Sequence, residues 1–140
     1  MPTPSIGALL LQLQKAHRQN MAGQLSALNL YPGQDGLLYH LSQNDGLTMS
    51  QLVAKMQIKH PTLFTMVNRM EAGGLIKKEK NSTDQRSSRI FLTEKGNTVL
   101  KELSQLWRDR EQTLWKDFSE EEKTNTTQLI SKLIHNLNHE

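Results

Sequence analysis

The chain has 140 residues, 36% of them hydrophobic, and its 17 Lys and Arg residues against 14 Asp and Glu residues give a net charge of +3. This is about the length of one domain, and no stretch approaches the roughly 18 consecutive apolar residues that a transmembrane helix needs. The absence of cysteine excludes disulfide bonds, cysteine–zinc sites and thiol-based redox chemistry. Because the N-terminus has no signal-peptide pattern, we expect a cytoplasmic protein with no membrane partner.

The N-terminal segment predicts one long amphipathic helix. Apolar residues recur at three- and four-residue steps from Ile6 to Leu28, and Thr3-Pro4 suits the N-cap and the first helical position. The breaker Tyr31-Pro32-Gly33 ends this helix, and a second helix follows and stops at Asn44-Asp45-Gly46.

A pair of short helices is predicted next. Thr48 and Gln51 have the spacing of a capping box, in which each side chain accepts from the other residue's backbone N–H, so a short helix begins there. Another helix begins near Pro61, because proline has no N–H to lose in a first helical turn. Two short helices joined by a tight turn form the helix-turn-helix pattern. In the second of them Leu63, Val67 and Met70 face inward, and the candidate DNA-reading residues outside are Lys59, His60, Thr62, Thr65, Asn68 and Arg69.

Residues 75–92 predict a basic β-hairpin. Two short apolar runs flank a loop rich in Asn, Ser, Thr and Asp, and a hairpin directly after a helix-turn-helix is a winged helix. Residues 55–95 hold nine Lys and Arg residues against four Asp and Glu residues, which is the asymmetry expected of a segment that faces phosphate. Lysines also protect exposed strand edges from aggregation, so those on the strands have a second interpretation. The candidate DNA contacts of the hairpin are Lys78, Arg86 and Arg89.

After the hairpin the sequence predicts a long helix from Thr93 that breaks at Phe118, then a final helix that begins with the capping box Ser119–Glu122. The first and last helices have more apolar length than a small winged helix can cover, which favours burial against a second copy of the chain. The expected fold is mostly α, an α+β winged helix with about six helices and a two-stranded β-hairpin wing. Residues 1–32 and 94–140 would form a helical dimerisation region, and residues 33–93 the DNA-binding lobe.

Several short motifs resemble the MarR family of bacterial transcription regulators. They are Met66-Val67-Asn68-Arg69-Met70-Glu71 with Gly74-Leu75-Ile76, then Asp84-Gln85-Arg86-Ser87, and then Ile90-Phe91-Leu92-Thr93 with Gly96. The resemblance implies a homodimer whose recognition helix, about residues 59–72, enters the major groove of double-stranded DNA. It also implies that Arg86 enters the minor groove and that Asp84 braces the wing. A two-fold dimer predicts a pseudo-palindromic operator with half-sites roughly 10 base pairs apart.

The recognition helix departs from the family pattern at two positions. Phe64 and Thr65 stand where hydroxyl and longer polar side chains are usual, so the major-groove contacts look lighter. Phe64 either packs into the core, which we favour, or meets a thymine methyl group. Lys59 replaces the usual hydroxyl cap, which suggests a phosphate contact.

The resemblance also implies a pocket for a small aromatic or phenolic effector. Its candidate residues are His17, Tyr31, Tyr39, His40 and Trp107, although tyrosine and tryptophan are equally common as packing residues. No cofactor is expected, and the pair His135 and His139 lacks a third metal ligand nearby. No catalytic constellation is present, so we expect no enzyme.

Two functions remain open at this point. The favoured one is a ligand-responsive transcriptional regulator, more often a repressor, that binds DNA sequence-specifically. The alternative is a winged helix used for protein interaction, with weak or no specific DNA binding. The light recognition helix is the best support for that alternative.

Overall fold

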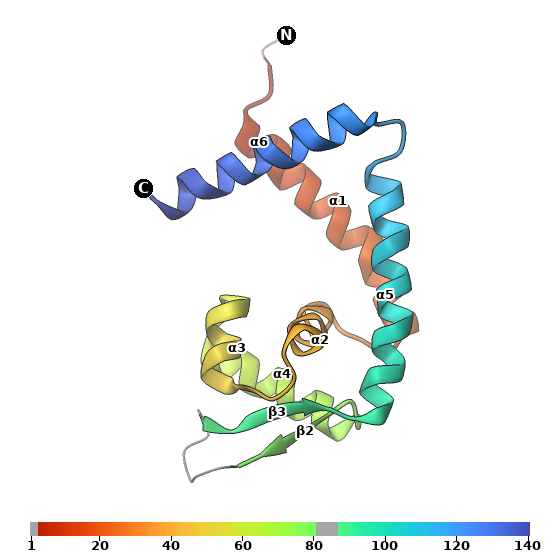
Figure 1. The fold of residues 1–140 in the computed structure, drawn as a ribbon, viewed down its shortest axis with the longest axis vertical. Helices are drawn as coiled ribbons and strands as arrows, with labels where there is room; N and C mark the ends of the chain where they lie inside the picture. The colour runs from red at the N-terminus through yellow and green to blue at the C-terminus, as the bar shows by residue number, and fades with distance from the viewer. Residues whose placement is uncertain (1–2, 81–86) are drawn as a thin grey trace. The chain divides into compact units, whose positions relative to one another are not determined.

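The computed structural model describes residues 3–80 and 87–140 (Figure 1). By internal contacts the chain forms two compact units, Met1–Gln105 and Leu106–Glu140. The elements are α1 (Ile6–Ala27), α2 (Gln34–Gln43), β1 (Leu47–Thr48), α3 (Met49–Met56), α4 (His60–Ala72), β2 (Ile76–Glu79), β3 (Arg89–Leu92), α5 (Glu94–Leu114) and α6 (Glu120–Asn138). Mostly helical with a small antiparallel sheet, the fold confirms the predicted winged helix.

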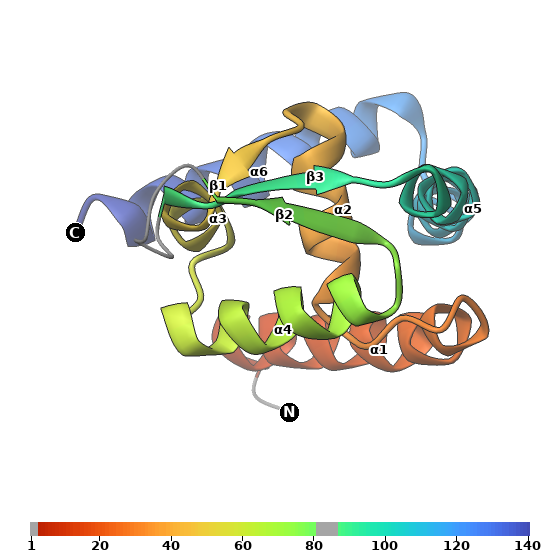
Figure 2. The ribbon, with the colours of Figure 1, turned by 90° about the horizontal axis from the view of Figure 1, so that it is seen from below.

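The core of the first unit lies between α2, α3, α4 and the sheet (Figure 2). All of these elements contribute fully buried apolar side chains, and each such side chain stabilises the fold by about 1.5–3 kcal/mol. They are Leu37, Leu38 and Leu41 of α2, Met49 and Leu52 of α3, Leu63, Val67 and Met70 of α4, Ile76 and Ile90 of the sheet, and Leu103 of α5. The four- and three-residue spacing on α4 therefore gives the inward face that the sequence predicts.

The sheet has one strand more than predicted. Its order is β1-β3-β2, all antiparallel, with Leu47 opposite Ile90 and Lys78 opposite Ile90 on the other side. Two further bonds support β1: Gly46 N–H donates to the Ile90 carbonyl (2.9 Å), and Leu92 N–H donates to Oδ1 of Asp45 (2.9 Å). A strand of two residues is too short to show alternation, which is why the sequence does not reveal it.

Helix starts follow the side chains that satisfy their first N–H groups. The predicted capping box at α3 is confirmed, since Gln51 N–H donates to Thr48 Oγ1 (3.1 Å) and Thr48 N–H donates to Gln51 Oε1 (2.9 Å). The predicted start of α1 at Thr3-Pro4 is wrong, because Ser5 is the N-cap and accepts from Ala8 N–H at 3.1 Å. The Ser5 hydroxyl supplies the acceptor that the first turn lacks.

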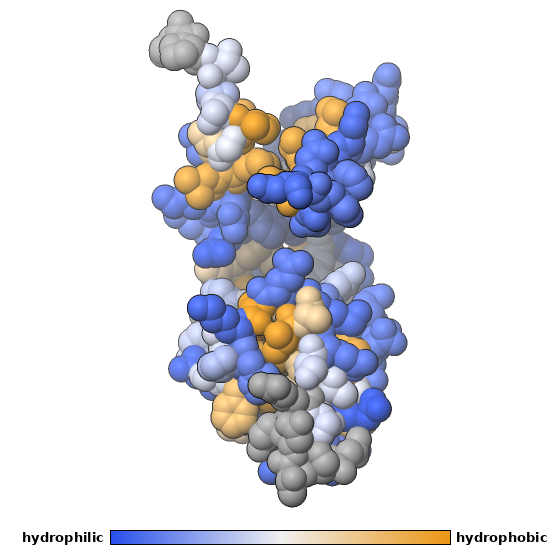
Figure 3. All heavy atoms as spheres, turned by 90° about the vertical axis from the view of Figure 1, so that its left-hand side faces the viewer, coloured by the Kyte–Doolittle hydropathy of each residue, from blue (hydrophilic) through white to orange (hydrophobic). Residues whose placement is uncertain are grey.

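The second unit consists of the end of α5 and α6. Ser119 and Glu122 form the predicted capping box at the start of α6, and α6 buries no residue within the chain. Its large apolar side chains Leu129, Ile134 and Leu137 are 54% to 70% exposed. Hydrophobic surface also gathers on the N-terminal part of α1, next to the grey terminus in Figure 3, where Ile6, Leu9, Leu11 and Leu13 are exposed.

Across the ranges 3–80 and 87–140, none of the helices has the combined length and apolar character that crossing a membrane requires. The same ranges contain no group of three or more His, Asp or Glu side chains arranged to hold a metal ion. His135 and His139 stack on each other instead, with ring centroids 4.2 Å apart.

Candidate nucleic-acid interface

The outer face of α4 presents the polar side chains expected of a recognition helix. Thr62, Thr65 and Arg69 are exposed and Asn68 is half-buried. Thr65 also donates from Oγ1 to the Pro61 carbonyl (3.1 Å), one turn earlier in the helix. His60 differs from the rest, since its Nε2 is buried and has no hydrogen-bond partner among the described residues. The helix thus offers a small, mainly neutral polar surface with one cation.

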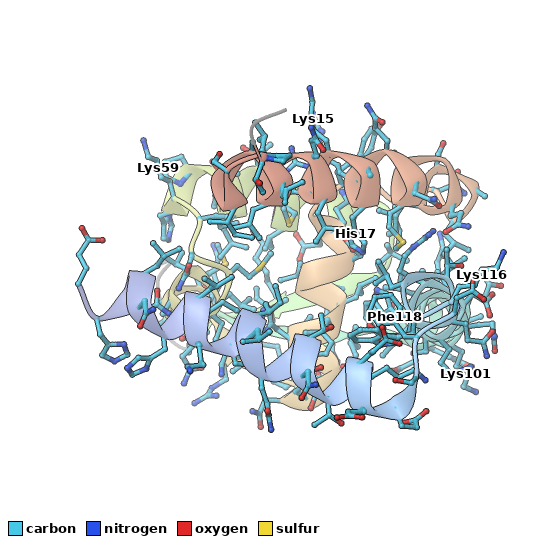
Figure 4. The ribbon with its side chains drawn as sticks, turned by 90° about the horizontal axis from the view of Figure 1, so that it is seen from above. Lys15, His17, Lys59, Lys101, Lys116 and Phe118 are labelled. Atoms are coloured by element: carbon cyan, nitrogen blue, oxygen red, sulfur yellow. The ribbon has the colours of Figure 1, made fainter. Side chains whose placement is uncertain are left out.

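The first turn of α4 has no side-chain cap. Lys59 is the N-cap residue, with extended backbone (φ −72°, ψ 147°), and its side chain makes no capping hydrogen bond. Lys59 instead extends outward from the start of the helix (Figure 4). An ammonium group beside unsatisfied helix N–H groups is an arrangement that suits a phosphate oxygen.

On one flank of α4, Lys78 of β2 contacts three residues of the helix. Its Nζ donates to Oδ1 of Asn68 (2.8 Å), and its backbone N–H donates to Oε2 of Glu71 (3.1 Å). The same ammonium lies 5.2 Å from the centroid of the Phe64 ring and 4.0 Å from Oε1 of Glu71. Because the side chain is only 14% exposed, Lys78 joins the hairpin to α4, and its predicted contact with phosphate stays a prediction.

Phe64 belongs to this junction and not to the core. Its side chain is 36% exposed, so the favoured prediction that it packs into the core is wrong. The ring packs under the Lys78 ammonium, which a cation–π attraction of about 0.5–1 kcal/mol at such exposed sites explains.

On the other flank, Arg69 stacks on Tyr31. The guanidinium carbon lies 5.4 Å from the centroid of the Tyr31 ring, which is 62% exposed in the turn between α1 and α2. Tyr31 N–H in turn donates to Oε1 of Gln34 (3.1 Å), and Gln34 is 5% exposed. Sequence reasoning did not single out Gln34, because a glutamine in the first turn of a helix carries no signal of burial.

The structure describes only some of the hairpin residues that the sequence predicts to be functional. Arg89, at the start of β3, donates from Nη1 to the Gly46 carbonyl (3.0 Å) and so links the hairpin to the turn before β1. Asp84 and Arg86 lie outside the described residues.

Residues 32–87, which include α2, α3, α4 and β2, match the model of the MarR family. Over these residues the chain has the winged helix of the MarR family.

Several solved structures are similar in fold to nearly the whole chain. A MarR family protein from Bacillus stearothermophilus is 26% identical, with a TM-score of 0.77 over 95% of this chain and 93% of that one. The S. aureus MepR–DNA complex is 24% identical, with a TM-score of 0.83 over 95% of this chain and 96% of that one. A MarR family transcriptional regulator from Listeria monocytogenes complexed with 26mer DNA is 24% identical, with a TM-score of 0.84 over 96% of this chain and 90% of that one.

Two of the predicted effector residues border separate cavities. Tyr31 borders a cavity of about 510 Å³, together with Arg69 and Lys95, whereas His17 borders a separate one of about 160 Å³. Tyr39 and His40 line neither of these two cavities and form an edge-to-face pair, with centroids 5.3 Å apart. Trp107 belongs to the second unit. The effector site therefore stays a prediction.

Proposed function

We propose that this chain is a homodimeric transcriptional regulator that binds double-stranded DNA sequence-specifically. The exposed polar face of α4 beside a basic hairpin, on a MarR-family fold, is the observation that carries this proposal. In this assignment α4 enters the major groove, and the wing, the hairpin of β2 and β3 with its connecting loop, places Arg86 in the minor groove. Two of the similar structures contain DNA, which supports the same assignment.

The proposed dimer accounts for apolar surface that one chain leaves uncovered. Four large apolar side chains of α1 and three of α6 are 42% to 70% exposed. Burying them against a second copy is favourable, since each square ångström of apolar surface removed from water contributes about 25 cal/mol. A two-fold dimer then presents two copies of α4 to successive major grooves, about 34 Å apart.

The proposed regulation is relief of repression by a small aromatic or phenolic effector. The 510 Å³ cavity is within the range of roughly 300–1,000 Å³ that ligand pockets occupy. Apolar side chains of Leu28, Met70, Leu75 and Val99 line it beside the cations Arg69 and Lys95, a combination that suits an aromatic anion. Because Arg69 belongs to α4, a ligand bound there would touch the DNA-reading helix directly. A thermal-shift screen with aromatic acids tests this part, and a flat response to all of them would contradict it.

Selection of bound duplexes from a random pool tests DNA binding. We expect an enriched pseudo-palindrome with half-sites roughly 10 base pairs apart, and an affinity whose logarithm falls linearly with the logarithm of salt concentration. Enrichment of a single half-site would contradict the dimer. Equal binding to enriched and random duplexes would contradict sequence specificity.

The minor-groove assignment of Arg86 predicts that Arg86→Ala weakens binding to the selected operator by about 1–3 kcal/mol. The physical reason is the negative potential of a narrow minor groove, which attracts an inserted guanidinium. Fluorescence anisotropy at moderate salt measures the loss, and sedimentation checks that the variant keeps the parent's oligomeric state. Unchanged affinity would remove Arg86 from the interface.

A protein-interaction module remains the second candidate. It is favoured by the 36% exposed Phe64 and by three cations, Arg69, Lys78 and Arg89, that already make contacts within the chain. Failure of the random pool to yield any bound duplex at low salt would favour this candidate.

A further inference from the structure

The contact between Lys78 and Asn68 fixes what the Asn68 amide can offer to DNA. A lysine ammonium has three donors and no acceptor, so the amide atom 2.8 Å from Nζ is necessarily the oxygen. The NH2 group occupies the other corner of the same planar amide and points away from Lys78. Asn68 sits on the outer side of α4, one turn after Phe64 and opposite the buried Leu63, Val67 and Met70.

Free asparagine and restrained asparagine read different bases. A free amide pairs with adenine through two bonds, accepting from N6–H and donating to N7, and this requires oxygen and nitrogen to face the same base edge. With the oxygen turned toward the part-buried Lys78, the NH2 donor is the part of the amide that faces the groove. Guanine offers this donor two acceptors, O6 and N7, whereas adenine offers N7 alone and places its N6–H donor beside the NH2 group.

We propose that Lys78 is a specificity-determining residue that acts through Asn68, biasing the base read by Asn68 toward guanine and against adenine. The inference rests on the proposed DNA-binding function and adds a base preference to it. Lys78 is thus a positioning residue: its side chain is 14% exposed, and its charge is engaged with α4.

Three contacts fix Lys78 in position beside Asn68. The backbone N–H of Lys78 donates to Glu71, so the β2 strand is fixed against the same helix that carries Asn68. The Phe64 ring lies under the ammonium on the same flank. The pairing of Lys78 with Ile90, a fully buried residue of the central strand, fixes the register of β2.

The neighbouring lysine supplies a matched control. Successive strand residues point to opposite faces, and Lys77 lies 59% exposed beside Glu79 and Phe91. Lys77→Met therefore removes the same charge one position away without touching α4. Lys78→Met keeps most of the buried stem and removes the donor, whereas Lys78→Arg keeps a donor within reach of Asn68.

The experiment selects duplexes from a random pool with the full-length parent, Asn68→Ala, Lys78→Met, Lys77→Met and Lys78→Arg. Loss of selectivity at one position with Asn68→Ala identifies the base pair that Asn68 reads. At that position the parent should prefer guanine, and Lys78→Met should shift the guanine-to-adenine ratio toward adenine by on the order of tenfold. Lys77→Met should lower affinity through charge alone and leave the ratio unchanged. Lys78→Arg should restore the parental ratio.

A measurement without DNA tests the contact itself. The side-chain amide resonances of Asn68 in nuclear magnetic resonance spectra should shift in Lys78→Met and stay in place in Lys77→Met. Unmoved resonances in a folded Lys78→Met protein would overturn the inference. So would a guanine-to-adenine ratio that Lys78→Met leaves unchanged while the parent binds its operator. A parent that enriches no duplex would overturn the proposed function, and the inference with it.

Discussion

Gly96 shows how closely backbone segments approach each other in the first unit. It lies in the first turn of α5, and a Cβ atom added there would be 2.1 Å from the carbonyl oxygen of Leu75. The same carbonyl accepts from Thr93 N–H (3.1 Å), so it is not free to move aside. Glycine at this position therefore lets the start of α5 pack against the start of the hairpin.

We expect Gly96→Ala to lower the free energy of unfolding by about 3 kcal/mol, the upper end of ordinary overpacking, because the contact is with backbone. Gly23→Ala is the matched control, since Gly23 lies in the C-terminal part of α1 and nothing is within 4 Å of its added Cβ. That change should raise stability by about 0.4–1 kcal/mol through reduced freedom of the unfolded chain. Urea unfolding followed by circular dichroism measures both, and equal effects of the two changes would contradict the close approach.

At the scale of residues, the sequence predicts which face of a helix a side chain lies on better than it predicts which residues that side chain contacts. The spacing of Leu63, Val67 and Met70 is enough to place Thr65 and Asn68 outside, because helix periodicity is local. The partners of Asn68 and Arg69 come from β2 and from the turn before α2, so they depend on how distant segments pack. The prediction that Phe64 packs into the core is wrong for the same reason, because the ammonium over its ring comes from Lys78 of β2.

At the scale of elements, the sequence predicts the helix starts at which two side chains form a capping box, whereas the single cap Ser5 of α1 was not predicted. The capping boxes at Thr48 and Ser119 follow from residues three apart, and both are present. The strand β1 could not be predicted from the sequence, because its two residues are defined by pairing with β3 and not by their own pattern. The start of α4 is an intermediate case, since Pro61 marks the first turn although no side chain caps it.

Because no side chain caps the start of α4, we expect a substitution of Lys59 to change folding stability and DNA binding in opposite directions. Lys59→Ser introduces a hydroxyl acceptor at the N-cap and should raise the free energy of unfolding by about 0.5–2 kcal/mol. The same change removes a cation from the proposed phosphate contact, so operator binding should weaken and its salt slope should fall by about one. Thermal unfolding and anisotropy titrations at several salt concentrations measure the two effects. Stabilisation with unchanged salt dependence would remove Lys59 from the interface.

At the scale of the whole molecule, the main feature to explain is that large apolar side chains of α1 and α6 are exposed to solvent. Each helix is described within its own unit, and neither buries these residues there. The sequence predicts this surplus from apolar length alone, since the stripes of the first and last helices exceed what one small lobe can cover. The predicted boundary of the dimerisation region stays a prediction, because no partner chain defines it.

Leu13→Glu and Ile134→Glu, made separately, should each shift the protein from dimer to monomer and reduce operator affinity by at least tenfold, since both half-sites are then no longer bound together. These side chains are 52% and 54% exposed in the single chain, so a carboxylate there costs nothing until a partner covers it. Sedimentation velocity and gel shift measure the outcome. Lys15→Glu is the control. His17 lies one turn after Leu13 on the same face of α1, and Lys15 projects from the opposite side of the helix (Figure 4). If the Leu13→Glu variant and the Ile134→Glu variant each remain dimeric, the dimer interface lies elsewhere.

The small strand β1 determines which segments of this protein can be exchanged with those of a relative. Asp45 accepts from Leu92 N–H, Gly46 N–H donates to the Ile90 carbonyl, and Leu47 lies opposite Ile90 in the sheet. Arg89 donates in turn to the Gly46 carbonyl. A hairpin transplanted alone would leave behind the turn that closes its central strand. The transferable block is therefore residues 45–92 as a whole, and crossover points for chimaeric regulators belong before Asp45 and after Leu92.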